Sequence, residues 1–198
     1  MSINVVKSEE TFLVDSYYPN FRDFLPYIEN VQGIDYSWET TAFEAEQIPM
    51  WQTKELGRLP HKSYADEFKD RGFVNLLNQL CEFTKNQLSL AEIEADISPQ
   101  TSWLVKYNKG GWQSMHGHGH DTINQCLYFD ENPAMTKEGW DKKFQVYGSF
   151  FCVVGKALRT IPPMPGRLTT MTGSILHGVY PVMHTPRRCL VIEYKVNK

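Results

Sequence analysis

The clearest pattern of hydrophobic and polar positions lies just before the middle of the chain. Between Phe73 and Leu88, apolar residues recur at steps of three and four. On a helix this spacing forms one stripe, so we predict an amphipathic helix over about 63–90 that packs on a sheet. From Ala91 to Ile97 the period changes to two, with acidic residues between the apolar ones. This alternation predicts a half-buried antiparallel strand at a sheet edge.

The second half of the chain contains short apolar segments separated by turns that are rich in glycine and proline. They lie at 102–107, 123–129, 144–154, 168–171, 175–180 and 189–196. The polar stretch 130–143 between them is expected to form a loop. Many short strands with such turns are typical of a sandwich or a jelly roll.

The region before residue 60 is interrupted by proline and glycine, which allows only short elements: a strand near 11–15 and a helical turn near 21–30. A chain of 198 residues suits one domain. We therefore predict an α+β, β-rich fold over 1–198. In it, residues 1–100 form a helical and strand support, and residues 101–198 form a double-stranded β-helix, or jelly roll.

Composition narrows the function classes. The formal charge is −3 and no basic run is present, which argues against a nucleic-acid partner. The four cysteines are widely spaced in apolar surroundings without a CxxC pair, so we expect free buried thiols in a reducing compartment. No signal peptide and no apolar run of membrane-spanning length is visible, so we expect a soluble cytoplasmic protein without a membrane partner.

Candidate chemistry is concentrated at a histidine cluster. Three of the six histidines, His116, His118 and His120, alternate with glycines. A strand would place them on one face, and His177, on a distant apolar segment, could complete a site. Imidazole is the commonest metal ligand, and several together suit Fe, Zn, Cu or Ni better than Mg or Ca. From the cluster alone, a solvated loop that binds metal adventitiously is an equal alternative.

Several further motifs occur in a fixed order around this cluster. They are Trp103, Gly110-Gly111, Gln113, His116-x-His118, Tyr128, Pro165-Gly166-Arg167-Leu168, His177, Val179 and Pro181, followed by an arginine on the last strand. Over about 102–194 this series resembles the iron- and 2-oxoglutarate-dependent oxygenases. It is most similar to a bacterial and phage branch in which a second histidine replaces the usual Asp or Glu ligand.

The resemblance implies that His116, His118 and His177 hold Fe(II) on one face, with 2-oxoglutarate as the cosubstrate. The commoner site has two histidines and one carboxylate, so the second histidine is a departure from the pattern. Asp121 could act as the ligand instead of His118, or His120 could. Zn or Ni in place of Fe also stays open.

The far carboxylate of 2-oxoglutarate needs a cation, and Arg187 and Arg188 are the candidates. If Arg188 faces inward, so do the apolar residues of the alternating set Leu190, Ile192 and Tyr194. If Arg187 does, the set is Cys189, Val191 and Glu193, which would bury a carboxylate. We therefore predict that Arg188 binds 2-oxoglutarate. By similarity Tyr128 and Tyr107 would bind the same carboxylate, although each could be a buried phenol on a sheet.

The implied activity is hydroxylation, or another oxidation, of an unactivated C–H bond in a small molecule or in a prolyl or other peptide side chain. A first alternative is a cupin-like metalloprotein that does not use 2-oxoglutarate. Cupins place a Glu ligand soon after His-x-His, where this chain has Thr122, Ile123 and Asn124. A second alternative is a non-catalytic jelly-roll binding module. The oligomeric state, homodimer included, stays open.

Overall fold

The computed structural model describes residues 3–29, 50–52, 71–107, 110–131, 146–183 and 187–197. The predicted helical residues 63–70 and most of the predicted 130–143 loop lie outside these ranges. Within them the fold is mostly β-sheet, arranged in two sheets. No helix in the described ranges is long and apolar enough to cross a membrane.

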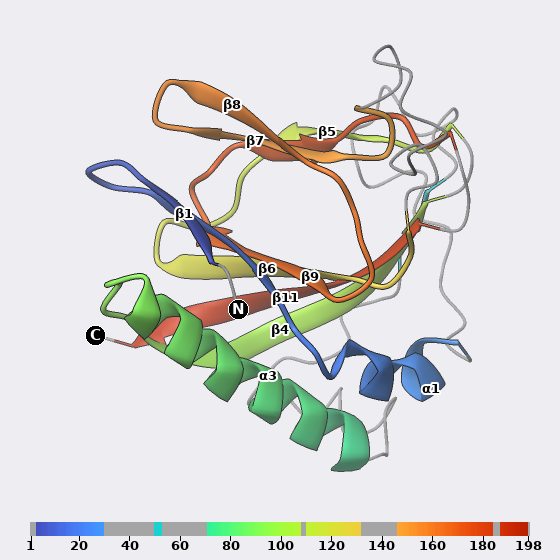
Figure 1. Cartoon of the computed structure of the whole chain (residues 1–198), viewed down its shortest axis with the longest axis horizontal. Helices are drawn as coiled ribbons and strands as arrows, with labels where there is room; N and C mark the ends of the chain where they lie inside the picture. Colours follow the sequence, from blue (N-terminus) through green and yellow to red (C-terminus); the bar gives the residue numbers. More distant parts are fainter. Residues whose placement is uncertain are drawn as a thin grey trace.

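The two sheets face one another, and their strands come from all parts of the chain (Figure 1). The larger has the order β1-β2-β9-β6-β11-β4-β3 and the smaller the order β5-β10-β7-β8. The strands are β1 (Asn4–Lys7), β2 (Phe12–Tyr17), β3 (Met50–Gln52), β4 (Asp96–Tyr107), β5 (Gln113–His116), β6 (Thr122–Tyr128), β7 (Phe150–Val154), β8 (Ala157–Ile161), β9 (Arg167–Thr172), β10 (His177–Val179) and β11 (Arg187–Asn197). All the pairings are antiparallel.

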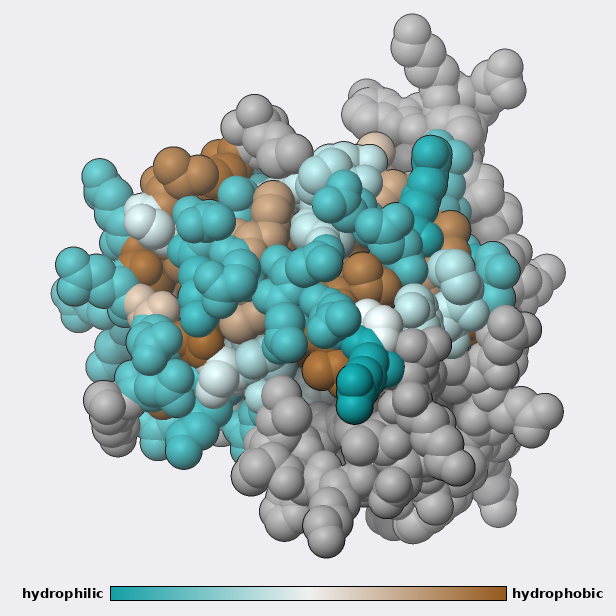
Figure 2. All heavy atoms as spheres, turned by 90° about the horizontal axis from the view of Figure 1, so that it is seen from below, coloured by the Kyte–Doolittle hydropathy of each residue, from teal (hydrophilic) through white to brown (hydrophobic). Residues whose placement is uncertain are grey.

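The outer face of the larger sheet is covered by the long helix α3 (Arg71–Leu90), below the sheet in Figure 1. The apolar stripe predicted from the sequence is buried, with Phe73, Leu80 and Leu88 almost inaccessible to solvent. Seen from the helix side, the described surface is mostly hydrophilic with scattered apolar residues (Figure 2). The buried stripe and the hydrophilic outer surface together confirm the predicted amphipathic helix for residues 71–90. The short helices η1 (Phe21–Phe24) and α1 (Leu25–Ile28) pack beside its start, where the rings of Phe24 and Phe73 meet edge to face at 5.9 Å.

The strand predicted over 91–97 is wrong in its position. Residues 91–95 form a turn and an irregular segment, in which Glu92 has φ 54° and Ile93 and Ala95 pack against the core without strand pairing. The strand is β4, which begins at Asp96 and continues through Pro99. A register shift lies at this proline, because Glu193 is opposite Thr101 and Tyr194 is opposite Pro99. Such bulges tolerate a residue that has no N–H to donate.

The predicted strands at 11–15, 102–107, 123–129, 168–171 and 189–196 correspond to β2, the second half of β4, β6, β9 and β11. The segments 144–154 and 175–180 contain shorter strands than predicted, β7 and β10. Strands β1, β3 and β8 were not predicted. Two of the three are very short, and β8 carries the mostly exposed sequence Leu158-Arg159-Thr160, so none has a clear hydrophobic pattern.

The central strands of the larger sheet are buried on both faces. One face contributes to a core with α3, which includes Ile123, Leu127 and Leu190. The other face contributes to a second core between the two sheets, which includes Cys126, Tyr128 and Cys189. All four cysteines are buried and free, which confirms the prediction of free buried thiols. The candidate site lies between the sheets.

Candidate metal centre

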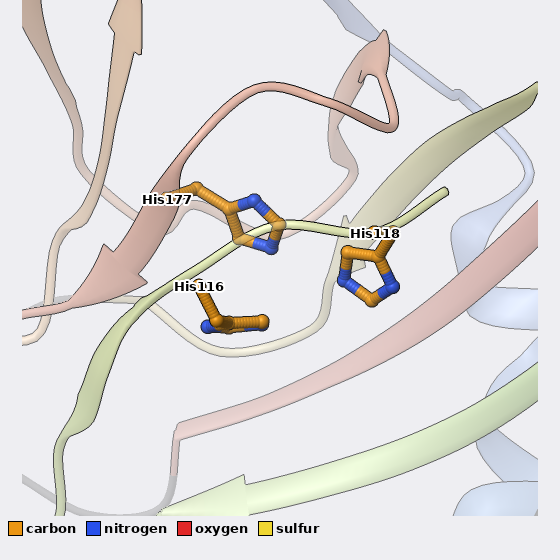
Figure 3. Close-up of side chains that lie close together, drawn as sticks. All are labelled: His116, His118 and His177. Atoms are coloured by element: carbon orange, nitrogen blue, oxygen red, sulfur yellow. The ribbon is translucent and has the colours of Figure 1, made fainter. Parts of the chain in front are cut away.

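Three histidines converge between the two sheets. His116 ends β5 and His177 begins β10, and the pairing of these strands sets the two residues directly opposite each other. His118 follows β5 by two residues and turns toward the same space (Figure 3). The ring centres are 4.3 Å apart for His116 and His177, 5.2 Å for His118 and His177, and 5.4 Å for His116 and His118. One ring nitrogen from each lies within 4.8 Å of the others, so the three could hold one metal ion.

Two of the rings are fixed by a hydrogen bond at Nδ1. Nδ1 of His116 lies 2.9 Å from the carbonyl oxygen of Ser114, and Nδ1 of His177 lies 2.9 Å from that of Ile175. A carbonyl oxygen only accepts, so Nδ1 donates in both rings and the lone pair of each ring is on Nε2, the atom that can bind a metal. Nδ1 of His118 faces a carboxylate instead, with Oε2 of Glu193 at 3.4 Å.

The electrostatics keep two of these rings neutral. Burial, with the neighbouring His116, lowers the pKa of His177 to about 3. Burial also lowers the pKa of His116. Neutral imidazole is the form that binds metal, so the site does not need to lose protons from these rings near neutral pH. The donor set therefore fits a transition metal with affinity for nitrogen, such as Fe, Zn or Ni.

The alternatives to His118 are not in the cluster. His120 and Asp121 are exposed to solvent beyond the end of β5, and neither belongs to the group of converging ligand atoms. His118 is partly buried and its ring is stacked parallel to that of His177, with 4° between the planes. Among the described residues, the structure therefore brings together the three histidines that the resemblance implied.

The arginine prediction is wrong in its choice of face. Arg187 points into the cavity that the three histidines line and is only 4% exposed. Arg188 points away from it and donates from its guanidinium to Asp130, with Nη2 to Oδ1 at 2.7 Å. The alternation along β11 was read correctly, but both of its faces are buried. Leu190, Ile192 and Tyr194 pack toward α3, on the opposite side from the site.

Arg187 is held rigidly at one end of the cavity. Its Nε donates to the carbonyl oxygen of Gly148 at 2.6 Å. Its guanidinium carbon lies 4.6 Å from the centre of the Tyr107 ring and 5.4 Å from that of Tyr128. Within the described part of the chain, no carboxylate forms an ion pair with it. A buried guanidinium without a carboxylate is a candidate anion site.

The two tyrosines line the same cavity but differ in their hydrogen bonds. Tyr107 donates from its hydroxyl to Oε1 of Gln113 at 2.8 Å, and Nε2 of Gln113 lies 3.4 Å from Nε2 of His116. The hydroxyl of Tyr128 is buried without a partner among the described residues. Burial raises the pKa of both phenols, so both remain protonated.

Two further residues at the site were not assigned a role from the sequence. Gln113 appeared only as part of a motif, although it links Tyr107 to His116. Glu193 appeared only as a reason to reject Arg187. In the structure Glu193 lies beside the site, with its carboxylate next to the ring of His118. The sequence could have indicated Glu193, because side chains an even number of residues apart on a strand point to the same side, and Glu193 is six residues after Arg187.

Comparisons with known proteins agree with this fold. No protein-family model matches the sequence, and no curated protein is significantly similar to it. Among solved structures, a prolyl-4-hydroxylase from Pseudomonas putida aligns with a TM-score of 0.53 and 14% identity, over 93% of this chain and 92% of that one. A prolyl hydroxylase from Trichoplax adhaerens, in complex with a hypoxia inducible factor peptide fragment, aligns at 0.56 and 10%, over 95% and 84%.

A third similar structure is HygX from Streptomyces hygroscopicus, solved with nickel and 2-oxoglutarate bound. It aligns with a TM-score of 0.61 and 10% identity, over 94% of this chain and 84% of that one. Another is described as a member of the 2OG-Fe(II) oxygenase family. The chain thus has the fold of the 2-oxoglutarate- and Fe(II)-dependent oxygenases, as the sequence resemblance predicted.

Proposed function

We propose that this chain is an Fe(II)- and 2-oxoglutarate-dependent oxygenase that hydroxylates, or otherwise oxidises, an unactivated C–H bond. One observation carries the proposal: three converging imidazoles line the same cavity as a buried arginine that has no carboxylate partner among the described residues. The imidazoles are donors for a transition metal, and the guanidinium is a partner for an anion. A cosubstrate that chelates a metal at one end and carries a carboxylate at the other satisfies both.

His116, His118 and His177 would hold the metal through Nε2, since the Nδ1 atoms of the three rings are directed at Ser114, Glu193 and Ile175. When bound, Fe(II) together with 2-oxoglutarate supplies the oxidising power, because three protein ligands leave positions open for the cosubstrate and dioxygen. The protein's part is to fix the rings of His116 and His177 and to keep them neutral. The two backbone acceptors and the burial of His116 and His177 perform these tasks.

The far carboxylate of 2-oxoglutarate would bind Arg187. Tyr128 would donate its hydroxyl to the same carboxylate, which supports the proposal because this hydroxyl is buried without a partner in the described ranges. The buried hydroxyl of Thr169, on β9, acts against burial by lowering the pKa of the Tyr128 phenol, so it competes as a partner for this hydroxyl. Tyr107 already donates to Gln113, so we assign its ring to stacking beneath Arg187. Arg188 is left with its structural ion pair to Asp130.

We further propose that the eight strands β4 to β11 form a double-stranded β-helix. Along the chain these strands fall in the larger, smaller, larger, smaller, smaller, larger, smaller and larger sheet. In a double-stranded β-helix the chain passes back and forth between two antiparallel sheets, as it does here. It supports the site because it brings β5 and β10 of one sheet opposite β11 of the other.

For the substrate we propose a peptide side chain, prolyl included, or a small molecule. Similar structures include prolyl hydroxylases, one of them with a peptide, and HygX with hygromycin B bound. A shared fold accommodates many substrates through its loops.

The proposal is tested by anaerobic addition of Fe(II) with and without 2-oxoglutarate. Bidentate chelation at a metal with open adjacent positions gives a weak charge-transfer band near ~500 nm. We expect this band in the wild type, its loss in His116→Ala, and its retention in His120→Ala, which removes an exposed histidine of the same segment. If metal binds but 2-oxoglutarate adds no band, a cupin-like metalloprotein that does not use 2-oxoglutarate replaces this proposal.

A further inference from the structure

A carboxylate lies behind one of the three histidines. Oε2 of Glu193 is 3.4 Å from Nδ1 of His118, and the two side chains are only 17% and 18% exposed. Within the described ranges, His118 is the only cationic or imidazole group that pairs with Glu193. His118 thus differs from His116 and His177, whose Nδ1 atoms face neutral backbone carbonyls.

The position of Glu193 follows from the strand that carries it. On β11, the alternation that points Arg187 into the cavity also points Cys189, Val191 and Glu193 toward the smaller sheet. The residue opposite on β6 is Asn124, whose side-chain amide is buried and has no hydrogen-bond partner in the described part of the chain. No lysine or arginine of the described residues neutralises Glu193 there. Even partial burial of a carboxylate is unfavourable unless it has a hydrogen-bond or charged partner.

The charges of the site provide that partner. Three neutral imidazoles would hold a divalent cation without offsetting its charge, and Arg187 adds a further positive charge to the same cavity. In the commoner two-histidine site a carboxylate ligand supplies the negative charge. A carboxylate that accepts from the outer nitrogen of a ligating histidine orients the ring and makes it a stronger donor.

We propose that Glu193 is a positioning residue for the metal centre, which holds His118 through Nδ1 and supplies the negative charge that the three-histidine ligand set lacks. This inference rests on the proposed metal centre. Glu193 does not act as a ligand itself. Its carboxylate is at Nδ1, on the side of the ring away from Nε2, and it is not among the converging ligand atoms.

The test uses the full chain with Co(II) as the probe, because its visible spectrum reports affinity and ligand geometry. Glu193→Gln keeps an acceptor oxygen but removes the charge, and Glu193→Ala removes both. Glu94→Gln is the matched control, because Glu94 is an exposed carboxylate outside the site. We expect the Kd for Co(II) to rise about 10- to 100-fold in Glu193→Ala, less in Glu193→Gln, and not in the control.

A second measurement separates positioning from general support of the fold. In the Co(II) form, the Nδ1–H protons of ligating histidines give exchangeable, paramagnetically shifted NMR signals. We expect one such signal for each of the three rings in the wild type. Only the His118 signal should be lost by exchange with water in Glu193→Ala, and it should return in Glu193→Gln. A purely structural role would disturb all three signals together.

The outcomes distinguish this inference from the proposed function. Equal affinities and an unchanged His118 signal in all variants would overturn the role of Glu193 and leave the metal centre intact. A wild-type spectrum with only two histidine signals and a carboxylate ligand would overturn it too. If the wild type does not bind Co(II) at the histidines, the metal centre fails, and the inference fails with it.

Discussion

Arg187 is buried against Tyr107, with the guanidinium carbon 4.6 Å from the centre of the ring. The neighbouring Arg188 lies on the other face of the same strand, where Asp130 accepts from its guanidinium. Two adjacent arginines therefore have different environments: one is a candidate anion site, and the other is part of an ion pair that joins the start of β11 to the chain after β6. This difference makes a direct comparison of the two possible.

Arg187→Ala should weaken 2-oxoglutarate binding, while Arg188→Ala should leave it nearly unchanged. Loss of one partner of a buried charge pair costs about 2–5 kcal/mol, which corresponds to a rise of about 30-fold or more in the Kd for 2-oxoglutarate. The measurement is a titration of 2-oxoglutarate into the anaerobic Fe(II) protein, followed by the charge-transfer band. A defect in Arg188→Ala and none in Arg187→Ala would contradict the assignment. Arg187→Lys should restore only part of the affinity, because it keeps the charge but not the planar fork.

Tyr128→Phe should have opposite effects on stability and on cosubstrate binding. Its hydroxyl is buried without a hydrogen bond to any described residue, so its removal should leave the free energy of unfolding of the metal-free protein unchanged or raise it by about 1 kcal/mol. The same change should weaken 2-oxoglutarate binding by about tenfold, since a hydrogen bond to a charged group contributes about 1.5 kcal/mol. Urea unfolding and the titration above measure the two effects.

The control for this substitution is Tyr107→Phe, in which the lost hydroxyl does have a partner, Gln113. That variant should be destabilised, by about 1 kcal/mol, because the amide oxygen loses its donor. A stability loss in Tyr128→Phe as large as that in Tyr107→Phe would mean that the Tyr128 hydroxyl is satisfied within the protein.

The metal-free protein should lose stability in acid through His177. Burial lowers its pKa to about 3, whereas the unfolded chain has the ordinary value of about 6.5. Between these values the unfolded chain binds a proton that the folded chain does not. The free energy of unfolding should therefore fall as the pH falls from about 6.5 toward about 3, by up to about 1.4 kcal/mol per pH unit. Above this window the contribution is fully present.

Urea unfolding of chelator-treated protein at about pH 7 and about pH 5 measures this loss. His177→Gln has no titrating group at this position and should have a shallower dependence on pH, whatever its stability near neutrality. Equal slopes for the two proteins would show that His177 does not titrate across this window.

Gly178→Ala should disturb the site through the backbone. A Cβ atom at Gly178 would lie 2.7 Å from the carbonyl oxygen of Gln113 and 2.5 Å from the Phe151 ring, so β10 would have to shift and move His177. We expect a loss of about 1–3 kcal/mol in stability and weaker metal binding. Gly117→Ala is the matched control beside the other two histidines, because its nearest contact, a side-chain atom of Leu176, is at 3.5 Å. Similar losses in both variants would contradict this account.

Local patterns in the sequence determined much of the fold and the identity of the three histidines. The stripe from Phe73 to Leu88 predicts α3 because a helix of this length buries one face whatever it packs against. The spacing of His116 and His118 places them on one face of an extended segment, but it does the same for His120. The order of motifs that resembles the oxygenases is what singled out His116, His118 and His177 as the expected ligands. The predicted start of β4, by contrast, is wrong. Ile93 and Ala95 pack against the core although they do not belong to a strand.

Only the tertiary structure decided which face of β11 carries the chemistry. Alternation divides Arg187, Cys189, Val191 and Glu193 from Arg188, Leu190, Ile192 and Tyr194, but it gives no direction in space. The sheet is covered on both sides, by α3 and by the smaller sheet, so both sets are buried and hydrophobicity cannot distinguish them. The cost of burying Glu193 favoured the wrong set, because the partner that offsets it, His118, comes from a segment more than 70 residues away. Contacts between distant segments depend on how the sheets pack, and the pattern along one strand does not contain that information.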